Sequence, residues 1–395
     1  MKKTIKDLDL KGKRAVIRVD YNVPLKDGKV TNDARVRASL ETINTVLAAG
    51  ASVVLLSHLG RPKGKYSEEF SLKPVVGVLE NLIGKKVKFI PDEEVVSDRV
   101  LEEVRELKAG EIALLENTRF VAGEEKNDPE FARKLSSLGD VYINDAFGTA
   151  HRAHASNVGI AQNLPSAMGY LVEKEVKYIK NAIENPKRPF VAILGGAKVS
   201  DKIGVIDNLL GIVDKIIIVG AMANTFVKAM GCEVGKSLVE DDKLELAKEL
   251  ISRAKENGVD MILPVDFVIA EELKSGVPTE VVAANEIPSD KAAFDIGPES
   301  VKRIEDALNG AATVIWNGPC GVFEIDEFAK GTFSVAEALA NLKDAITIVG
   351  GGDSGAAVEK SGVEDKISHV STGGGASLEM LEGKVLPGID IIEEA

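Results

Sequence analysis

The chain contains little cysteine, few aromatic residues and no long apolar run. Its two cysteines, Cys232 and Cys320, exclude a disulfide framework and a cysteine-rich metal site, and they fit a reducing compartment. No stretch approaches about 18 consecutive apolar residues, so we expect no membrane-spanning helix. The first residues, MKKTIKDLDL, hold no apolar segment of signal-peptide length, and we therefore expect a cytoplasmic protein.

Positive charge is also in deficit, because the formal net charge is -13. This balance disfavours a nucleic acid or an anionic membrane as partner, and any site for an anion has to be built locally against the overall field. A length of 395 residues predicts two domains, and a hydrophobic content of 45% is enough for a sizeable core in each.

Short apolar runs alternate with helical patterns along the whole chain. The predicted strands are 14–19, 52–57, 111–116, 141–144, 190–194, 215–220, 261–265, 312–317, 345–350 and 367–371, and one predicted helix covers 34–50. Most of these strands are apolar on both faces, as in a buried parallel sheet. The alternation predicts two doubly wound, Rossmann-like α/β domains.

The sequence predicts a helix over 171–185, which we expect to connect the two domains. Val172, Val176, Ile179 and Ile183 form one apolar face, and Pro186 and Pro189 end the helix. We therefore predict an N-terminal domain at 1–170 and a C-terminal domain at 171–379. A tail at about 380–395 is expected to pack back on the first domain, with a hinge and a cleft between the two.

In open α/β sheets, ligands bind beyond the carboxyl ends of the strands. The loops that follow the first-half strands contain arginine and three of the four histidines of the chain, in VDYNVP (19–24), SHLGRP (57–62), ENTRF (116–120) and NDAFGTAHRAHAS (144–156). Arginine binds carboxylate and phosphate through paired hydrogen bonds. The repetition predicts a basic pocket for a small, multiply anionic molecule, and the alternative is a set of separate surface ion pairs.

The loops that follow the second-half strands are rich in glycine. They are LGGAKVSDKIG (194–204), VGAMANTF (219–226), NGPCGVFE (317–324), VGGGDSGAAVEK (349–360) and STGGGASLEML (371–381). Glycine lets a ligand approach the main chain, and helix N-termini offer free amides to a phosphate. Lys198 and Lys202, four residues apart at a predicted helix start, are expected to face one way. Ordinary turn glycine is the alternative.

Two further motifs are ambiguous. GCEVGKS (231–237) is one residue short of a P-loop and follows no strand, so Gly231 is better explained as a helix C-cap. GGGDSG (350–355) matches a dinucleotide fingerprint, but the next strand ends in Ser371 and Thr372 without the acidic residue that such a site needs. Asp353 would repel a pyrophosphate unless a cation bridged them, which favours a metal–nucleotide site. A nicotinamide-dependent oxidoreductase and a non-catalytic, two-lobed binding protein remain as alternatives.

Taken together, RVDYNVP, SHLGRP, LENTRF, NDAFGTAHRAHAS, LGGAKVSDKI, NGPCGVFE, VGGGDS and STGGGASLE resemble the phosphoglycerate kinase family over nearly the whole chain. The resemblance implies a monomeric phosphotransferase with a carboxyl group as acceptor. It would move a phosphoryl group from 1,3-bisphosphoglycerate to ADP in glycolysis, giving 3-phosphoglycerate and ATP, with Mg²⁺ as cofactor.

The resemblance also implies roles for individual residues. Those expected to bind phosphoglycerate are Asp20, Tyr21, Asn22, Arg35, His58, Leu59, Gly60, Arg61, Arg119 and Arg152. Those expected to bind the nucleotide are Gly195, Gly196, Lys202, Gly220, Ala293, Asn317, Pro319, Glu324, Gly351, Gly352, Asp353 and Ser354, with Glu324 at the ribose and Asp353 as the Mg²⁺ ligand. Arg35, Lys198 and the main chain at Gly373, Gly374 and Gly375 would flank the transferred group.

The chain departs from the family pattern in three places. Ala293 stands where the family usually has glycine beside the nucleotide, and the contact there is expected to shift. Thr118 and Cys320 replace a commoner valine and methionine, away from the expected chemistry.

Overall fold

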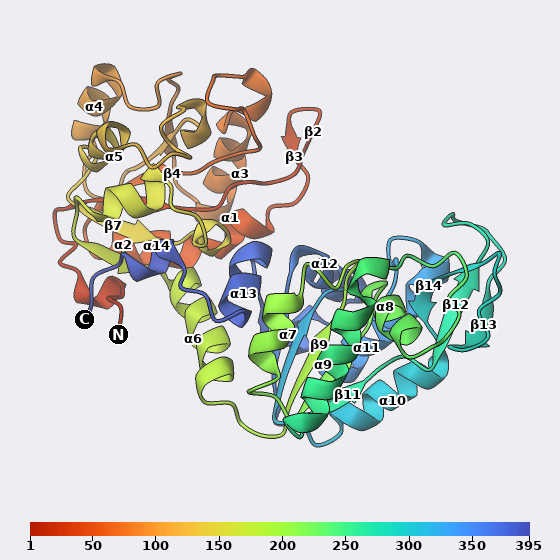
Figure 1. The fold of residues 1–395 in the computed structure, drawn as a ribbon. Helices are drawn as coiled ribbons and strands as arrows, with labels where there is room; N and C mark the ends of the chain where they lie inside the picture. Colours follow the sequence, from red (N-terminus) through yellow and green to blue (C-terminus); the bar gives the residue numbers. More distant parts are fainter. The chain divides into compact units, whose positions relative to one another are not determined.

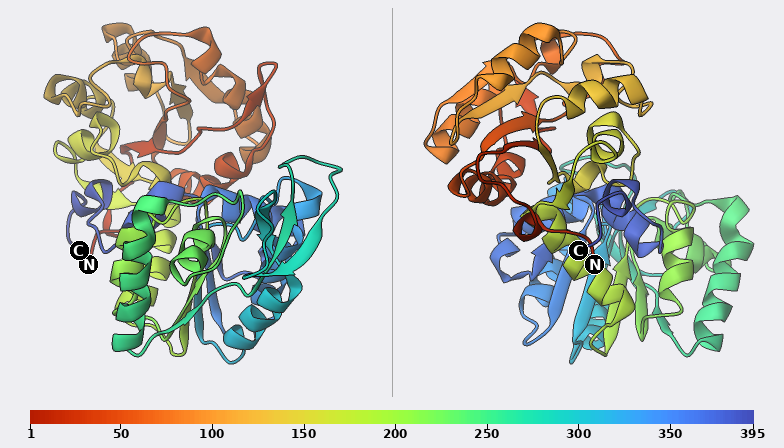
Figure 2. Two further views of the ribbon diagram at one scale, coloured as in Figure 1. Left: turned by 45° about the vertical axis from the view of Figure 1, so that its right-hand side comes forward. Right: turned by 90° about the vertical axis from the view of Figure 1, so that its left-hand side faces the viewer.

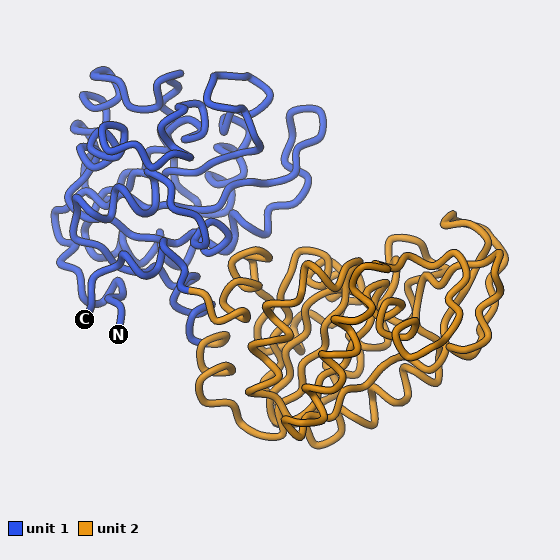
Figure 3. Tube along the Cα trace, in the orientation of Figure 1, with its two compact units in different colours: residues 1–177, 385–395 blue, residues 178–384 orange.

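The computed structural model describes all 395 residues, and the chain folds into two compact units. Unit 1 comprises Met1–Lys177 and Val385–Ala395, and unit 2 comprises Tyr178–Lys384 (Figure 3). The chain passes between the units twice, within helix α6 (Tyr170–Glu184) and after Lys384. The first boundary lies inside α6, whereas the sequence-based boundary stands at residue 171, at the start of that helix.

Unit 1 is built on a six-stranded parallel sheet in the order β5-β6-β4-β1-β7-β8. Figure 1 labels β4 and β7 of this sheet. Its strands are β1 (Arg14–Arg18), β4 (Ser52–Leu56), β5 (Val87–Ile90), β6 (Ile112–Leu115), β7 (Val141–Asn144) and β8 (Ser166–Met168). Its other elements are the hairpin β2 (Leu25–Lys26) and β3 (Lys29–Val30), and the helices α1 (Ala34–Ala38), α2 (Leu40–Ala48), α3 (Lys73–Ile83), α4 (Asp98–Arg105), α5 (Pro129–Ser136) and α14 (Pro387–Asp390).

The helix predicted over 34–50 is interrupted at Ser39, and one continuous helix is therefore wrong. The Ser39 hydroxyl bonds to the carbonyl of Val36 at 2.7 Å and to the Tyr21 hydroxyl at 2.8 Å. A serine hydroxyl that bonds locally competes with the helical ladder. The break separates α1, which carries Arg35, from the longer α2.

Unit 2 contains a second six-stranded parallel sheet in the order β11-β10-β9-β15-β16-β17, and Figure 2 shows helices flanking it. Its strands are β9 (Phe190–Leu194), β10 (Lys215–Ile218), β11 (Asp260–Ile262), β15 (Thr313–Asn317), β16 (Ile346–Gly350) and β17 (His369–Val370). Its helices are α7 (Ile203–Leu209), α8 (Met222–Ala229), α9 (Leu244–Glu256), α10 (Pro298–Leu308), α11 (Lys330–Ala340), α12 (Gly352–Ser361) and α13 (Gly374–Leu381). A small antiparallel sheet, β13-β12-β14, adds β12 (Asp266–Ala270), β13 (Glu280–Ala283) and β14 (Ala292–Ile296).

The prediction of two doubly wound parallel sheets is confirmed. In unit 2, Val191 and Ile193 of β9 share one apolar cluster with Ile304 of α10, Val335 of α11 and Val358 of α12. Because every pairing within the two large sheets is parallel, the carboxyl ends of the strands in each sheet meet along one edge. The loops expected to bind ligands therefore lie together within each unit.

Two smaller expectations are also settled by the backbone. Gly231 follows the end of α8 with a φ of +96°, and its amide donates to the carbonyl of Lys228 at 2.9 Å. This is a helix C-terminus, so GCEVGKS is not a P-loop. None of the helices is both long and apolar enough to cross a membrane.

Candidate functional site

A network of hydrogen bonds joins the strand-end loops of unit 1. Arg35 Nη1 lies 3.1 Å from Asp20 Oδ1 and donates to the carbonyl of Asn22 at 3.0 Å. The Asn22 side chain accepts from the amide of Gly60 at 2.8 Å, and Arg119 donates to the carbonyl of Gly60 at 2.9 Å. Five predicted residues from four chain segments are thereby brought together, and we call them, with His58, Arg61 and Arg152, the basic site.

Positive charge is concentrated in the basic site. Burial lowers the pKa of His58 well below its usual value, and the charges of Arg18, Arg119 and Arg35 lower it further. Burial also lowers the pKa of Arg119. The charges of Arg18 and Arg152 lower it further, whereas Glu125 opposes the shift. The imidazole of His58 is therefore neutral at pH 7. Arg35 pairs with Asp20 at 3.1 Å and Arg119 with Glu125 at 3.7 Å, whereas Arg61 and Arg152 are exposed at the site. Such a site favours a multiply charged anion.

Arg18 is a residue of this site that the sequence reading missed. It lies in β1 rather than in a loop, and only 1% of its surface is exposed. Its guanidinium donates to Ser156 Oγ at 2.8 Å and contacts His58 Nδ1 at 3.0 Å. An arginine inside the otherwise apolar run AVIRV (15–19) was the available signal, because a buried charge needs a specific partner.

Two predicted residues of unit 1 turn their side chains into the core. Tyr21 is fully buried and its hydroxyl bonds to Ser39, and Leu59 is also buried. Only the main chain of these two residues remains for contact with a ligand. Arg61 and Arg152 are exposed, so both guanidinium groups are accessible.

In unit 2, the N-termini of α12 and α13 lie next to each other, and both begin with glycines. Gly351 precedes α12 with a φ of +96°, and α13 begins at Gly374. A Cβ atom on Gly374 would lie 3.2 Å from the amide nitrogen of Gly352. The row of glycines at 373–375 therefore lets α13 bring its free amides next to those of α12. We call Gly351–Ser354, Gly373–Gly375, Lys202 and Asn317 the amide site.

Lys202 and Asn317 form a buried polar pair in the amide site. The Lys202 ammonium donates to Asn317 Oδ1, while Asn317 Nδ2 is buried without a hydrogen-bond partner. Burial lowers the pKa of Lys202 to about 8, although Asp201, Asp353 and Glu382 oppose the shift. A desolvated ammonium beside an unpaired amide donor is suited to an anion.

The expected pairing of Lys198 with Lys202 at one helix start is wrong. Helix α7 begins only at Ile203, so Lys202 is its N-cap and Lys198 lies in the preceding loop. Lys198 is exposed, whereas Lys202 is buried.

The side chain of Ser354, a predicted nucleotide-binding residue, is used within the protein. Its buried hydroxyl accepts from the amide of Gly318 at 2.7 Å.

A pocket of about 340 Å³ in unit 2 adjoins the amide site at Asp353. The predicted residues that line it are Gly196, Gly220, Ala293, Pro319, Glu324 and Asp353. Gly195 and Gly220 are required by close packing, because a Cβ on either would lie 2.3 to 2.5 Å from main-chain atoms of Pro319 and Gly196. Leu238 and Leu273 also line the pocket, and the sequence reading missed both because neither lies in a motif.

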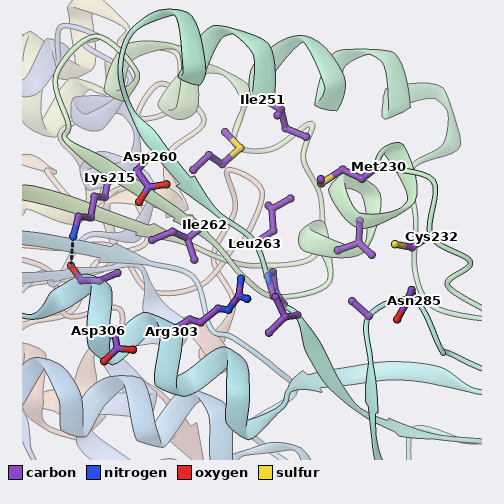
Figure 4. A pocket seen from close by; sticks show the side chains of 16 residues that line it. Lys215, Met230, Cys232, Ile251, Asp260, Ile262, Leu263, Asn285, Arg303 and Asp306 are labelled. Carbon is purple, nitrogen blue, oxygen red and sulfur yellow. Dashed lines mark hydrogen bonds between the residues drawn. The ribbon is translucent and has the colours of Figure 1, made fainter.

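A larger groove of about 850 Å³ lies beside β11 and is unrelated to the predicted residues (Figure 4). Met230, Ile251 and Leu263 are among the apolar side chains that line it, and Arg303 and Asp306 belong to its charged wall. None of its lining residues belongs to the basic site, the amide site or the smaller pocket. Volume alone therefore does not identify the functional site.

Comparisons with known proteins identify the family of the chain. A sequence profile of the family described as "Phosphoglycerate kinase" matches residues 5–384. Among the curated relatives, a phosphoglycerate kinase of Finegoldia magna is 57% identical over 393 residues, and one of Moorella thermoacetica is 57% identical over 393 residues. Each of these alignments covers 100% of this chain and 99% of the relative.

Solved structures give the same result. The phosphoglycerate kinase of Coxiella burnetii superimposes with a TM-score of 0.89 at 42% identity, and 99% of each chain is covered. That of Pyrococcus horikoshii gives 0.85 at 34% identity, with 98% of each chain covered. The resemblance inferred from the motifs is confirmed, and the chain belongs to the phosphoglycerate kinase family.

Proposed function

We propose that the basic site and the amide site hold the two substrates of one reaction. The reaction transfers a phosphoryl group reversibly from 1,3-bisphosphoglycerate to Mg-ADP and gives 3-phosphoglycerate and ATP, a step of glycolysis. One observation supports the proposal most directly, namely the hydrogen-bond network of the clustered arginines in unit 1. It joins Asp20, Asn22, Arg35, Gly60 and Arg119. The glycolytic role places the enzyme in the cytoplasm, where we expect a monomer.

The basic site is suited to phosphoglycerate. Arg35, Arg61, Arg119 and Arg152 supply forked donors for its carboxylate and phosphate. Asp20 and Asn22 hold Arg35 in place and leave polar atoms for the hydroxyl group of the substrate. His58 is neutral, so its imidazole hydrogen-bonds the ligand and does not add to the charge.

The pocket of unit 2 is suited to the nucleotide. Its volume of about 340 Å³ and its lining by Gly196, Gly220 and Pro319 fit a flat base. Glu324 is exposed at the pocket and is placed to accept from the ribose hydroxyls. The phosphates then extend over the N-terminus of α12 towards Lys202 and Asn317.

Asp353 suits the Mg²⁺ ion that accompanies the nucleotide. It is exposed in the first turn of α12 and is the acidic residue common to the pocket and the amide site. The structure contains no cluster of three or more metal-binding side chains. A single carboxylate fits Mg²⁺, which usually binds one or two carboxylates together with substrate phosphates and water. The ion neutralises part of the phosphate charge when bound.

Catalysis needs alignment and charge stabilisation, not a base. The group released from 1,3-bisphosphoglycerate, which is the acceptor in the reverse direction, is a carboxylate that is already ionised near neutral pH. Arg35, the exposed Lys198 and the amides at Gly373–Gly375 stabilise the charge on the phosphoryl group during in-line transfer. Since each site holds one substrate, the transfer requires the two units to close, with a hinge around 171–185 and help from 371–376. Closure also expels water that would compete as acceptor.

A coupled assay with 1,3-bisphosphoglycerate and Mg-ADP tests the proposal directly. The wild-type chain should form ATP, and Arg35→Ala should lower kcat by at least about 10³-fold while the affinity for ADP is kept. Arg37→Ala is the matched control, because Arg37 lies on the same helix but pairs with Asp33 at 2.9 Å on the exposed side. If Arg35→Ala mainly weakened ADP binding, the assigned role would be wrong.

A further inference from the structure

Two consecutive buried residues at the end of β7 hold both segments of chain that connect the units. Asn144 is the last residue of β7, and Asp145 begins the loop that follows it. Neither side chain is exposed to solvent. Residues buried this deeply at a strand end are fixed by their partners, and the partners of this pair are the start of α6 and the C-terminal segment.

Asp145 binds the free amides at the N-terminus of α6. Its Oδ1 accepts from the amide of Leu171 at 2.9 Å, and its Oδ2 is buried without a hydrogen-bond partner. The amide of Val172 and the side chain of Thr42 lie close enough to lower the pKa of this carboxylate. Thr42 in turn accepts from the amide of Tyr170 at 3.0 Å. The amides of Tyr170 and Leu171, which have no partner within the helix, are thus satisfied by side chains of unit 1.

The backbone at Gly169 lies very close to the Asp145 carboxylate. A Cβ atom on Gly169 would lie 2.1 Å from Asp145 Oδ1. Gly169 therefore lets the carboxylate approach the helix start closely, and the entry of the chain into α6 is fixed by a direct contact.

Asn144 holds the returning segment. Its Nδ2 donates to the carbonyl of Gly388 at 2.8 Å, and its Oδ1 accepts from the amide of Ala146 at 3.1 Å. The amide of Gly388 donates to the carbonyl of Ala150 at 2.8 Å. Gly388 belongs to α14, only a few residues after the chain re-enters unit 1.

The same loop reaches the basic site. The amide of Asp145 donates to the carbonyl of Arg18 at 2.9 Å, and the Arg18 side chain contacts His58. Further along the loop lie His151 and Arg152, the second of which belongs to the basic site. One continuous run of residues therefore touches the anion site and both chain connections.

We propose that Asn144 and Asp145 are positioning residues for phosphoryl transfer, because through them the basic site is held in register with both segments that lead to unit 2. The inference rests on the proposed function. Neither residue touches a substrate; each acts through the segment that it binds. Loss of either contact should impair the step that needs both units and leave the binding of single substrates intact.

The charge state of Asp145 supports this role. Its pKa is raised to about 7, mainly by burial and to a smaller extent by Glu41, although Thr42 and the amides of Leu171 and Val172 oppose the shift. Burial and the charge of Asp145 raise the pKa of the neighbouring Tyr21, so its phenol stays neutral and adds no like charge beside the carboxylate. The ionised carboxylate is the better acceptor for a helix N-terminus, so kcat of the wild-type chain should rise as the pH rises through about 7.

Stability should change in the opposite sense. Because the pKa of Asp145 is higher in the folded chain than the usual value of 3.8, the ionised group costs folding free energy as the pH rises towards 7. Asp145→Asn removes this cost together with some hydrogen bonding. The substitution should therefore change Tm little at pH 8, although a purely structural residue would lose stability.

The decisive experiment compares isosteric substitutions. Asp145→Asn and Asn144→Asp should each lower kcat at least about tenfold, with the Kd of each substrate alone unchanged. The pH dependence of kcat near 7 should disappear in Asp145→Asn, and hydrogen exchange at the amides of Leu171 and Val172 should accelerate. Asp266→Asn is the control, because Asp266 is a buried carboxylate that caps α10 in the same way, at 2.7 Å from the amide of Ser300.

Asp266→Asn should lower Tm and leave kcat unchanged. The inference is overturned if Asp145→Asn keeps its kcat and pH profile, or if Asp266→Asn lowers kcat equally. Failure of the proposed function is distinguishable, because the wild-type chain would then form no ATP while the exchange at Leu171 and Val172 still reported on the contact.

Discussion

At the scale of single residues, the buried ammonium of Lys202 gives a test of the nucleotide site. Since its pKa is about 8, the free protein carries only part of this charge in mildly alkaline solution. A phosphate placed beside it would restore the charge, so binding of ADP should take up a proton and weaken as the pH rises above 8. Titration calorimetry in buffers of different ionisation enthalpy measures that proton directly.

The matching substitution separates Lys202 from its exposed neighbour. Lys202→Met should weaken ADP binding about 10- to 100-fold, the usual range for a hydrogen bond to a charged group, and should abolish the proton uptake. Lys198→Met should keep both the affinity and the uptake, because Lys198 is exposed in the loop before α7. Equal proton uptake in wild type and Lys202→Met would assign the shifted group elsewhere.

Residue identities could be predicted better than side-chain directions. The motifs located Asp20, Asn22 and His58 because parallel strands bring their carboxyl ends to one edge. Arg35 lies in α1 instead and was assigned from the family resemblance. Spacing alone does not show that Tyr21 turns inward to Ser39. Arg18 was overlooked because it lies within a strand, where an apolar run normally indicates core.

At the scale of elements, a substitution in the first turn of α13 tests the effect on stability and the effect on activity separately. Gly374→Ala should keep or raise the free energy of unfolding, since alanine favours a helix over glycine by about 0.5–1 kcal/mol. The added Cβ would lie 3.2 Å from the amide of Gly352 and push apart the two N-termini of the amide site. We therefore expect kcat to fall although the protein is no less stable, as measured by the coupled assay and urea unfolding.

Gly77→Ala provides the control for this comparison. Gly77 lies inside α3, and a Cβ there would have no atom within 4 Å. The substitution should raise stability by a similar amount and leave kcat unchanged. An unaltered kcat in Gly374→Ala would mean that the close approach of α13 to α12 is not needed for transfer.

Strands with continuous apolar runs could be predicted, whereas short strands, strands with interrupted burial and the strands of the antiparallel sheet could not. All ten predicted strands are present, because continuous apolar runs such as SVVLL and FVAIL are typical of the centre of a parallel sheet. The sequence reading missed β5, with its burial interrupted at Lys88 and Phe89, and the three-residue β8. It also missed β12, β13 and β14, whose antiparallel sheet exposes Val281 and lacks the βαβ spacing.

At the scale of the whole molecule, the charge of the basic site is opposite in sign to the net charge of the chain. The chain carries a formal net charge of -13, yet the basic site gathers Arg18, Arg35, Arg119 and Arg152 closely enough to perturb one another and His58. The acidic residues elsewhere in the chain confine the attraction of anions to the basic site. The composition correctly indicated that an anion site must be built by specific loops, and the structure places those loops at the carboxyl edge of one sheet.

The proposed transfer makes a prediction about the dimensions of the entire protein. The basic site belongs to unit 1 and the amide site to unit 2, and a phosphoryl group cannot pass directly between acceptor and donor unless both lie within about 3–3.5 Å of each other. Binding energy from both substrates should therefore favour a closed form that neither substrate stabilises alone. Small-angle scattering should give a smaller radius of gyration with 3-phosphoglycerate and a non-hydrolysable Mg-ATP analogue together than with either one. Asp145→Asn, in which the start of α6 is loosened, should bind both ligands and compact less than the wild-type chain. An unchanged radius with both ligands bound to the wild-type protein would contradict closure as the step that unites the two sites.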